Sequence, residues 1–276
     1  MKIATVGKGG SGKTTIAGIL ARIFASHDQH VLAIDGDPNP NLALTLGMSR
    51  DDADRISYIP ADLMQRVGER DGVAILKPKL PDDQIMARYG YRAAENADLI
   101  VMGKPDHGTA GTGCMCASHR AVRGLIAELT NIGEHTITDM EAGLEHLKRG
   151  TARNVDLMLI VAEPYYRSLE AAMRTYELAQ ELAIPFIRVV ANKVRDEQDR
   201  LAIESFCARH SMTLIGTVPH DDSLSEAERQ ATSPYDFAPA SPAVTALGKI
   251  ADAVNALAVP RGDGQPTPRA GTSPPA

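Results

Sequence analysis

The chain has 276 residues, of which 43% are hydrophobic and 23% charged, with a formal net charge of −6. This composition suits one α/β domain, and the lack of a lysine-rich arm or a long apolar run argues against nucleic-acid and membrane partners. Three cysteines, an odd number, argue against a disulfide framework. The N-terminus has no signal-peptide pattern, so we expect a cytoplasmic protein.

The first expected elements are a strand, a glycine-rich loop and a helix. Residues 3–6 form a short apolar run with a β-branched bias, and apolar residues recur at helical spacing over 16–23. Between them, residues 7–14 match the phosphate-binding pattern G-x-x-x-x-G-K-[ST]. Glycines let backbone N–H groups surround phosphate oxygens, and the following helix N-terminus adds partial positive charge.

This loop predicts a site for ATP and Mg²⁺. Lys13 is expected to reach the β- and γ-phosphates, and the Thr14 hydroxyl to ligate Mg²⁺. The residues expected to bind the nucleotide are Gly9, Gly10, Ser11, Gly12, Lys13, Thr14 and Thr15. The alternative is a glycine-rich turn that only joins a strand to a helix, which the matching flanks disfavour.

A second lysine in the loop, Lys8, narrows the class of protein. The pattern K-G-G-x-G-K-[ST] resembles the deviant Walker A ATPases, the group of MinD, ParA, Mrp and the nitrogenase iron protein. The resemblance implies a homodimer in which Lys8 acts in catalysis by reaching across the interface to the partner's nucleotide. The spacing alone leaves a solvated loop lysine as the alternative.

The next expected element is a buried parallel strand over 31–35, which ends in Asp35-Gly36-Asp37-Pro38. Carboxylates at the C-terminal edge of parallel strands face the ligand crevice. The resemblance implies that this segment is switch I, with Asp37 orienting or activating the attacking water and Asp35 near the Mg²⁺ shell. An Asx turn fixed by Pro38 is the structural alternative.

Residues 42–96 show no chemistry that we can assign. A short helix is expected over 61–67, a strand over 72–76 and a loop over 77–81. A further buried strand, expected over 97–103, leads toward a second glycine-rich stretch.

Two cysteines, Cys114 and Cys116, follow that stretch at the junction with an expected helix. A helix N-terminus favours the thiolate, which is the form that binds metal. Two thiolates cannot complete a tetrahedral site alone, but a symmetric dimer could join two such pairs. On spacing alone, a metal site, a redox pair and two buried cysteines all stay open.

The segment 138–147, with its D-M-E-A-G-L-E-H sequence, extends the resemblance. Together with the Cys-x-Cys, it resembles switch II of the CooC-type carbon monoxide dehydrogenase accessory ATPases, over nearly the whole chain. The resemblance implies a nickel-dependent maturation factor that dimerises with nucleotide, binds Ni²⁺ or Zn²⁺ through Cys114 and Cys116, and serves a client metalloenzyme. Independently, Asp139 ends an expected strand and is predicted to accept a hydrogen bond from a Mg²⁺-bound water. For His146, a metal-binding and a structural role stay open.

The base site is expected after the later strands, predicted over 155–161, 187–191 and 213–216. An Asn192-Lys193 pair here can hydrogen-bond a purine. Arg195 stands where guanine-binding proteins have an aspartate, which favours adenine. The resemblance implies that Asn192 binds adenine, and Pro219 is expected to pack on the base.

Alternating strands and helices predict a mostly parallel sheet with helices on both faces, the P-loop NTPase fold. We expect this domain over 1–258, with a closing helix near 247–254, and a disordered Pro/Gly-rich tail over 259–276. The function expected is a Mg²⁺-dependent ATPase acting as a metallochaperone in nickel insertion into carbon monoxide dehydrogenase. The alternatives are a ParA/MinD-like positioning ATPase, an iron–sulfur reductase and a non-enzymatic metal regulator.

Overall fold

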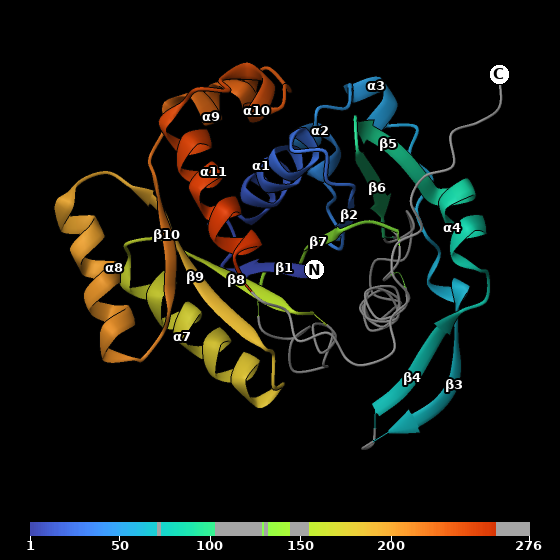
Figure 1. The fold of residues 1–276 in the computed structure, drawn as a ribbon, viewed down its shortest axis with the longest axis horizontal. Helices are drawn as coiled ribbons and strands as arrows, with labels where there is room; N and C mark the ends of the chain where they lie inside the picture. The colour runs from blue at the N-terminus through green and yellow to red at the C-terminus, as the bar shows by residue number, and fades with distance from the viewer. Residues whose placement is uncertain (71–72, 103–128, 130–131, 144–154, 258–276) are drawn as a thin grey trace, which may run out of the picture.

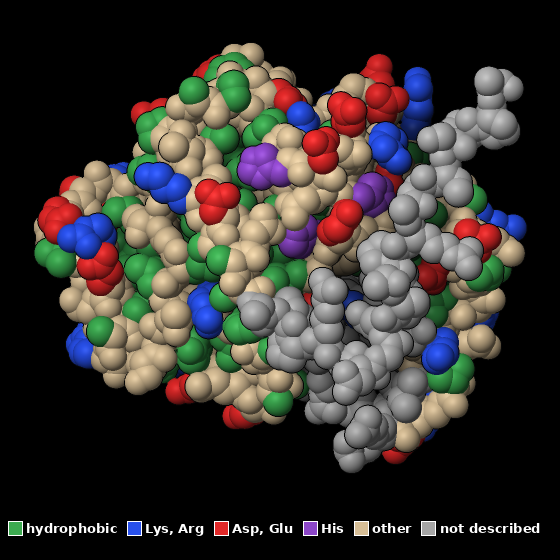
Figure 2. Space-filling model, in the orientation of Figure 1, with side chains coloured by type: hydrophobic (Ala, Val, Ile, Leu, Met, Phe, Trp, Pro, Cys, Tyr) green, Lys and Arg blue, Asp and Glu red, His purple; other side chains and the backbone are tan. Residues whose placement is uncertain are grey.

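A computed structural model describes residues 1–70, 73–102, 129, 132–143 and 155–257. The molecule is a sheet covered by helices on both faces (Figure 1). Lys, Arg, Asp and Glu side chains are interspersed across the described part of the surface in Figure 2. Within the described ranges, no helix is both long and apolar enough to cross a bilayer.

The main sheet has eight strands in the order β10-β9-β8-β1-β7-β2-β6-β5. All neighbouring pairs are parallel except β5 with β6. Their bounds are β1 Lys2–Gly7, β2 Val31–Asp35, β5 Gly90–Ala94, β6 Ala97–Val101, β7 His135–Asp139, β8 Leu157–Ala162, β9 Phe186–Val194 and β10 Leu214–Pro219. Strands β2, β7 and β8 are buried at every position, and burial on both faces explains why the sequences of β2 and β8 read as apolar runs without alternation. The predicted mostly parallel α/β fold is confirmed.

The sheet separates the core into two apolar clusters, one on each of its faces. One face is covered by α1 (Lys13–Ser26) and α11 (Pro242–Asn255), with the short helices α2 (Leu42–Leu46) and α10 (Pro234–Phe237) and the two-turn α9 (Asp222–Arg229) beside them. The other face is covered by α7 (Tyr166–Glu181) and α8 (Glu197–Arg209) (Figure 1). The predicted cover on both faces is therefore confirmed.

The segment between β2 and β6 departs most from the sequence prediction. It contains α3 (Arg50–Ala53), a 3₁₀ turn (Ala61–Leu63), the hairpin strands β3 (Met64–Arg70) and β4 (Val73–Pro78), and α4 (Asp82–Tyr89). The short helix predicted over 61–67 is wrong beyond its first turn, because from Met64 the chain pairs antiparallel with β4. Pairing with the second strand of the hairpin here outweighs local helix preference. The loop predicted over 77–81 begins two residues later in the structure than predicted, because β4 includes Lys77 and Pro78.

Candidate nucleotide site

The phosphate-binding loop leaves the sheet at the end of β1 and enters α1 at Lys13. Gly12 caps the helix with φ of +94°, a left-handed conformation that side chains rarely adopt. A Cβ on Gly12 would lie 2.4 Å from Nδ2 of Asn192. Both observations require glycine here. The close approach of Gly12 to Asn192 also shows that the start of α1 lies against the end of β9.

Inside the loop, Lys13 is buried and its Nζ donates to the backbone oxygen of Lys8 at 3.3 Å. The ammonium group therefore lies in the hollow of the loop, beside the N-terminus of α1. Lys8, Gly9 and Gly10 are exposed at the tip of the loop. The catalytic role of Lys8 stays a prediction.

A pair of carboxylates closes the other side of the loop. Asp35 and Asp139 are register partners at the ends of β2 and β7. The Thr14 hydroxyl donates to Oδ2 of Asp139 at 2.5 Å, and the Thr5 hydroxyl donates to Oδ1 at 3.2 Å. The parallel strands thus bring together Thr14, Asp35 and Asp139, three of the residues predicted to serve the Mg²⁺ site.

Burial controls the protonation of this pair. Burial, together with the neighbouring Asp139 charge, raises the pKa of Asp35 from 3.8 to about 7, although hydrogen bonds from Leu42 and Asp37 oppose the shift. Burial also raises the pKa of Asp139 to about 6, although the hydrogen bond from Thr14 and the charge of Lys13 oppose the shift. A divalent cation would relieve the cost of keeping both groups ionised.

The donor set fits Mg²⁺, which prefers oxygen ligands and keeps several waters. In the ranges that the structure describes, no group of three or more His, Cys, Asp or Glu side chains is placed to hold a metal. The Thr14 hydroxyl as a direct Mg²⁺ ligand and Asp139 as the acceptor for a Mg²⁺-bound water stay predictions, and their hydrogen bond to each other is compatible with both roles. Asp35 is tied to the backbone, because it accepts the N–H groups of Asn41 and Leu42 at 3.0 and 2.9 Å.

The raised pKa values predict that Mg²⁺ binding depends on pH. Between pH 3.8 and about 7 the folded chain holds more protons on this pair than the unfolded chain, so raising the pH through this window lowers the pair's contribution to the free energy of unfolding. Mg²⁺ binds the ionised form, so its affinity should rise about tenfold per pH unit for each proton displaced and level off above about pH 7.

Thermal unfolding with and without Mg²⁺, at a series of pH values, measures this effect. Asp139→Asn is the matched variant, since it keeps the shape of the side chain and removes one titrating group. We expect it to flatten the dependence on pH. An equal Mg²⁺ effect in mildly acidic and mildly alkaline buffer would contradict the prediction.

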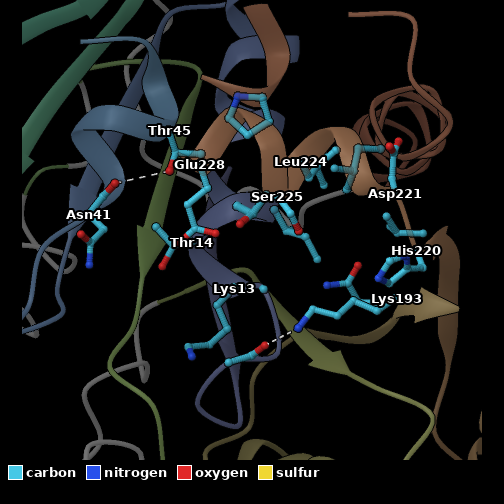
Figure 3. A pocket seen from close by; sticks show the side chains of 18 of the residues that line it. Lys13, Thr14, Asn41, Thr45, Lys193, His220, Asp221, Leu224, Ser225 and Glu228 are labelled. Atoms are coloured by element: carbon cyan, nitrogen blue, oxygen red, sulfur yellow. Dashed lines mark hydrogen bonds between the residues drawn. The ribbon is translucent and has the colours of Figure 1, made fainter. Parts of the chain in front are cut away.

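A cavity of about 450 Å³ adjoins the loop. Figure 3 shows Lys13 and Thr14 between two walls, with Asn41 and Thr45 on one side and Lys193, His220 and Asp221 on the other. The remaining lining residues include Gly10, Gly12, Thr15, Leu44, Asn192, Pro219, Leu224, Ser225 and Glu228. A nucleoside attached to phosphates in the loop would extend into this cavity.

The Asn192 amide has a fixed orientation at this cavity. Its Nδ2 donates to the backbone oxygen of Ser11 at 2.7 Å, and the side chain is buried. Oδ1 is then the group left to meet a base, and as an acceptor it suits the amino group of adenine rather than the carbonyl of guanine. Pro219 lies on the same wall. This geometry supports the predicted adenine contact, which stays a prediction.

A family model described as the CobQ/CobB/MinD/ParA nucleotide binding domain matches residues 2–235. The chain belongs to this family. Carbon monoxide dehydrogenase accessory protein CooC of Rhodospirillum rubrum is 39% identical over 250 residues, which cover 87% of this chain and 91% of CooC. An ATP-binding protein of Methanocaldococcus jannaschii is 38% identical over 233 residues, 83% of this chain and 88% of that protein.

Solved structures show the same fold. MinD of Pyrococcus horikoshii, solved with Mg-ADP, superposes with a TM-score of 0.69 at 20% identity, covering 92% of this chain and 96% of MinD. MinD of Aquifex aeolicus gives a TM-score of 0.68, covering 94% and 98%. Family membership and the loop geometry together make this protein an ATP hydrolase of the MinD/ParA type, for which ATP and Mg²⁺ are the fitting cofactors.

The sequence predicts further site residues at Asp37, Cys114 and Cys116. Asp37 is partly buried and its Oδ1 accepts the N–H of Asn39 at 2.8 Å, which is the Asx-turn contact of the structural alternative. Its role toward water stays a prediction. Cys114, Cys116 and His146 lie outside the described residues.

Some contributors to the site did not emerge from the sequence. Thr5 orients Asp139 from within β1, and nothing in an apolar strand signals that contact. The cavity wall that α9 forms could have been predicted from Asp221. This residue caps α9 by accepting the N–H of Ser223 at 3.0 Å, and it also accepts the N–H of Ala243 at 3.0 Å. An aspartate just before a polar segment is a helix-start signal.

Proposed function

We propose that this ATPase acts in the maturation of a metalloenzyme, inserting nickel into a client such as carbon monoxide dehydrogenase. The observation that carries the proposal is the similarity to the carbon monoxide dehydrogenase accessory protein CooC over most of both chains. The Cys-x-Cys at Cys114 and Cys116 supports it, since soft thiolates accept both Ni²⁺ and Zn²⁺.

The metal is cargo in this proposal, and a homodimer holds it. Two copies of the chain supply four thiolates, enough for one tetrahedral site. ATP binding favours the dimer, and γ-phosphoryl transfer to water resets it, with Lys8 of each copy serving the partner's nucleotide. The protein positions charge around the phosphates and forms no covalent intermediate.

Metal content and oligomeric state, measured together with and without Mg-ATP, test the proposal. We expect one nickel or zinc ion per dimer in the wild type, lost in Cys114→Ala while ATP binding survives. Cys207→Ala is the matched control, because Cys207 is buried on α8, where burial raises the pKa of its thiol to about 11. This control should retain the metal.

The competing function is a positioning ATPase, which the similarity to MinD of Bacillus subtilis favours at 27% identity over 266 residues, 94% of this chain and 90% of that protein. Dimerisation with ATP but no bound metal in either wild type or Cys207→Ala would contradict metal insertion. Sedimentation with anionic vesicles or with duplex DNA would then distinguish the surfaces on which such an ATPase acts.

A further inference from the structure

The end of β9 carries a β-bulge beside the phosphate-binding loop. Ala191 pairs with Thr217 and Val194 pairs with Pro219, so β9 has one more residue than β10 between these two pairs. The extra residue falls at Asn192 and Lys193. Successive side chains of a regular strand point to opposite faces, and a bulge can re-aim them. Here the bulge lets two consecutive side chains reach the same loop.

Lys193 is held tightly in this position. Its Nζ donates to the backbone oxygen of Gly10 at 2.6 Å and pairs with Oε1 of Glu163 at 3.0 Å. Figure 3 shows the lysine extended toward the loop, with the dashed bond at its end. Its φ is +58°, a conformation uncommon for residues other than glycine. The strained backbone at Lys193 thus occurs together with a side chain that is directed to two specific partners, Gly10 and Glu163.

Each of the two side chains fixes one peptide of the loop. In a trans peptide the C=O and N–H groups point in opposite directions. Asn192 holds the carbonyl of Ser11, which turns the N–H of Gly12 away from β9. Lys193 holds the carbonyl of Gly10, and the N–H of the same peptide, on Ser11, donates to the backbone oxygen of Lys8 at 3.2 Å. That bond closes the turn at the tip of the loop.

We propose that Lys193 is a positioning residue that fixes the tip of the phosphate-binding loop, and that Glu163 orients Lys193. The sequence suggests the Asn-Lys pair as a purine contact, but in this proposal its two residues have different roles. Asn192 faces both loop and cavity, whereas the Lys193 ammonium group serves the loop backbone and the ion pair with Glu163.

The decisive variant is Lys193→Met, which keeps an unbranched apolar stem and removes the donor. A hydrogen bond from a charged donor, discounted because this lysine is 40% exposed, corresponds to a loss of about 5- to 30-fold in nucleotide affinity. The loss should be equal for ATP and GTP, because the loop meets phosphates and not the base. A fluorescent-nucleotide competition assay measures both.

Three further variants test the details. Lys193→Arg, which keeps charge and donors, should recover most of the affinity. Lys193→Gly relieves the backbone strain, so it should melt no lower than Lys193→Met and still lose the same affinity. Glu163→Gln should cost less, and adding it to Lys193→Met should cost nothing further, since both act through one contact. Lys249→Met, at an exposed lysine on α11, is the matched control and should bind ATP as the wild type does.

Three results would overturn the proposal. One is wild-type affinity in Lys193→Met at an unchanged melting temperature. Another is a change in the ratio of ATP to GTP affinity, which would place Lys193 at the base. The third is a multiplicative loss in the double variant, which would show that Glu163 acts by a separate route.

Discussion

Replacing Lys13 by alanine should lower the turnover of ATP about 10²- to 10³-fold, the usual cost of removing one preorganised charge from a phosphoryl-transfer site. The Lys13 ammonium group lies inside the loop, 3.3 Å from the backbone oxygen of Lys8. Among the described residues, Lys13 is the only buried lysine. Phosphate release at saturating Mg-ATP measures the loss. Lys249→Ala, the same truncation on α11, should leave turnover unchanged.

The same substitution has a second, independent readout. The charge of Lys13 lowers the pKa of Asp139, so its removal should raise that pKa above about 6. The pH at which Mg²⁺ begins to stabilise the protein should then move upward. Turnover within about tenfold of the wild type would show that Lys13 does not meet the transferred phosphate.

Replacing Gly12 by alanine should abolish nucleotide binding and lower the free energy of unfolding by about 2–4 kcal/mol. Two costs add: the left-handed backbone at φ of +94°, and a Cβ placed 2.4 Å from Nδ2 of Asn192. Because that nitrogen holds the carbonyl of Ser11, displacing it also releases the loop.

Gly10→Ala separates the two costs. Gly10 has φ of +79°, but nothing lies within 4 Å of a Cβ built there. It should therefore show only the backbone cost, about 1–2 kcal/mol. Denaturant unfolding of both variants gives the difference, and equal destabilisation by the two substitutions would contradict a clash with Asn192.

The sequence predicted the fold well where strands are buried on both faces. Runs such as those of β2 and β8 have no partly exposed positions to blur the pattern, and the loop of β1 is defined by spacing alone. It predicted poorly between β2 and β6. The hairpin of β3 and β4 has an exposed Val67, and its pairing depends on residues brought together by the turn.

The candidate site was predictable as a set of positions but less so as a set of contacts. Thr14, Asp35 and Asp139 follow motif positions, and parallel strands necessarily bring the two aspartates to one edge. The contacts of Lys193 depend on a bulge, an extra residue relative to β10 that only the pairing register reveals. The sequence also did not reveal that Asp35, predicted to lie near the Mg²⁺ shell, accepts the N–H of Leu42 at 2.9 Å; its place near the metal stays a prediction.

Backbone hydrogen bonds hold the first residue after β2 and the first residue after β7 against the edge of the sheet. The N–H of Gly36 donates to the carbonyl of Asp139 at 2.9 Å, and the N–H of Met140 donates to the carbonyl of Thr5 at 3.1 Å. The first residue after β2 and the first after β7 are thus fastened to neighbouring strands. The two segments that the sequence predicts to be switches therefore leave the sheet at Gly36 and Met140, and each of these residues is bonded or adjacent to Asp139, whose carboxylate accepts the Thr14 hydroxyl.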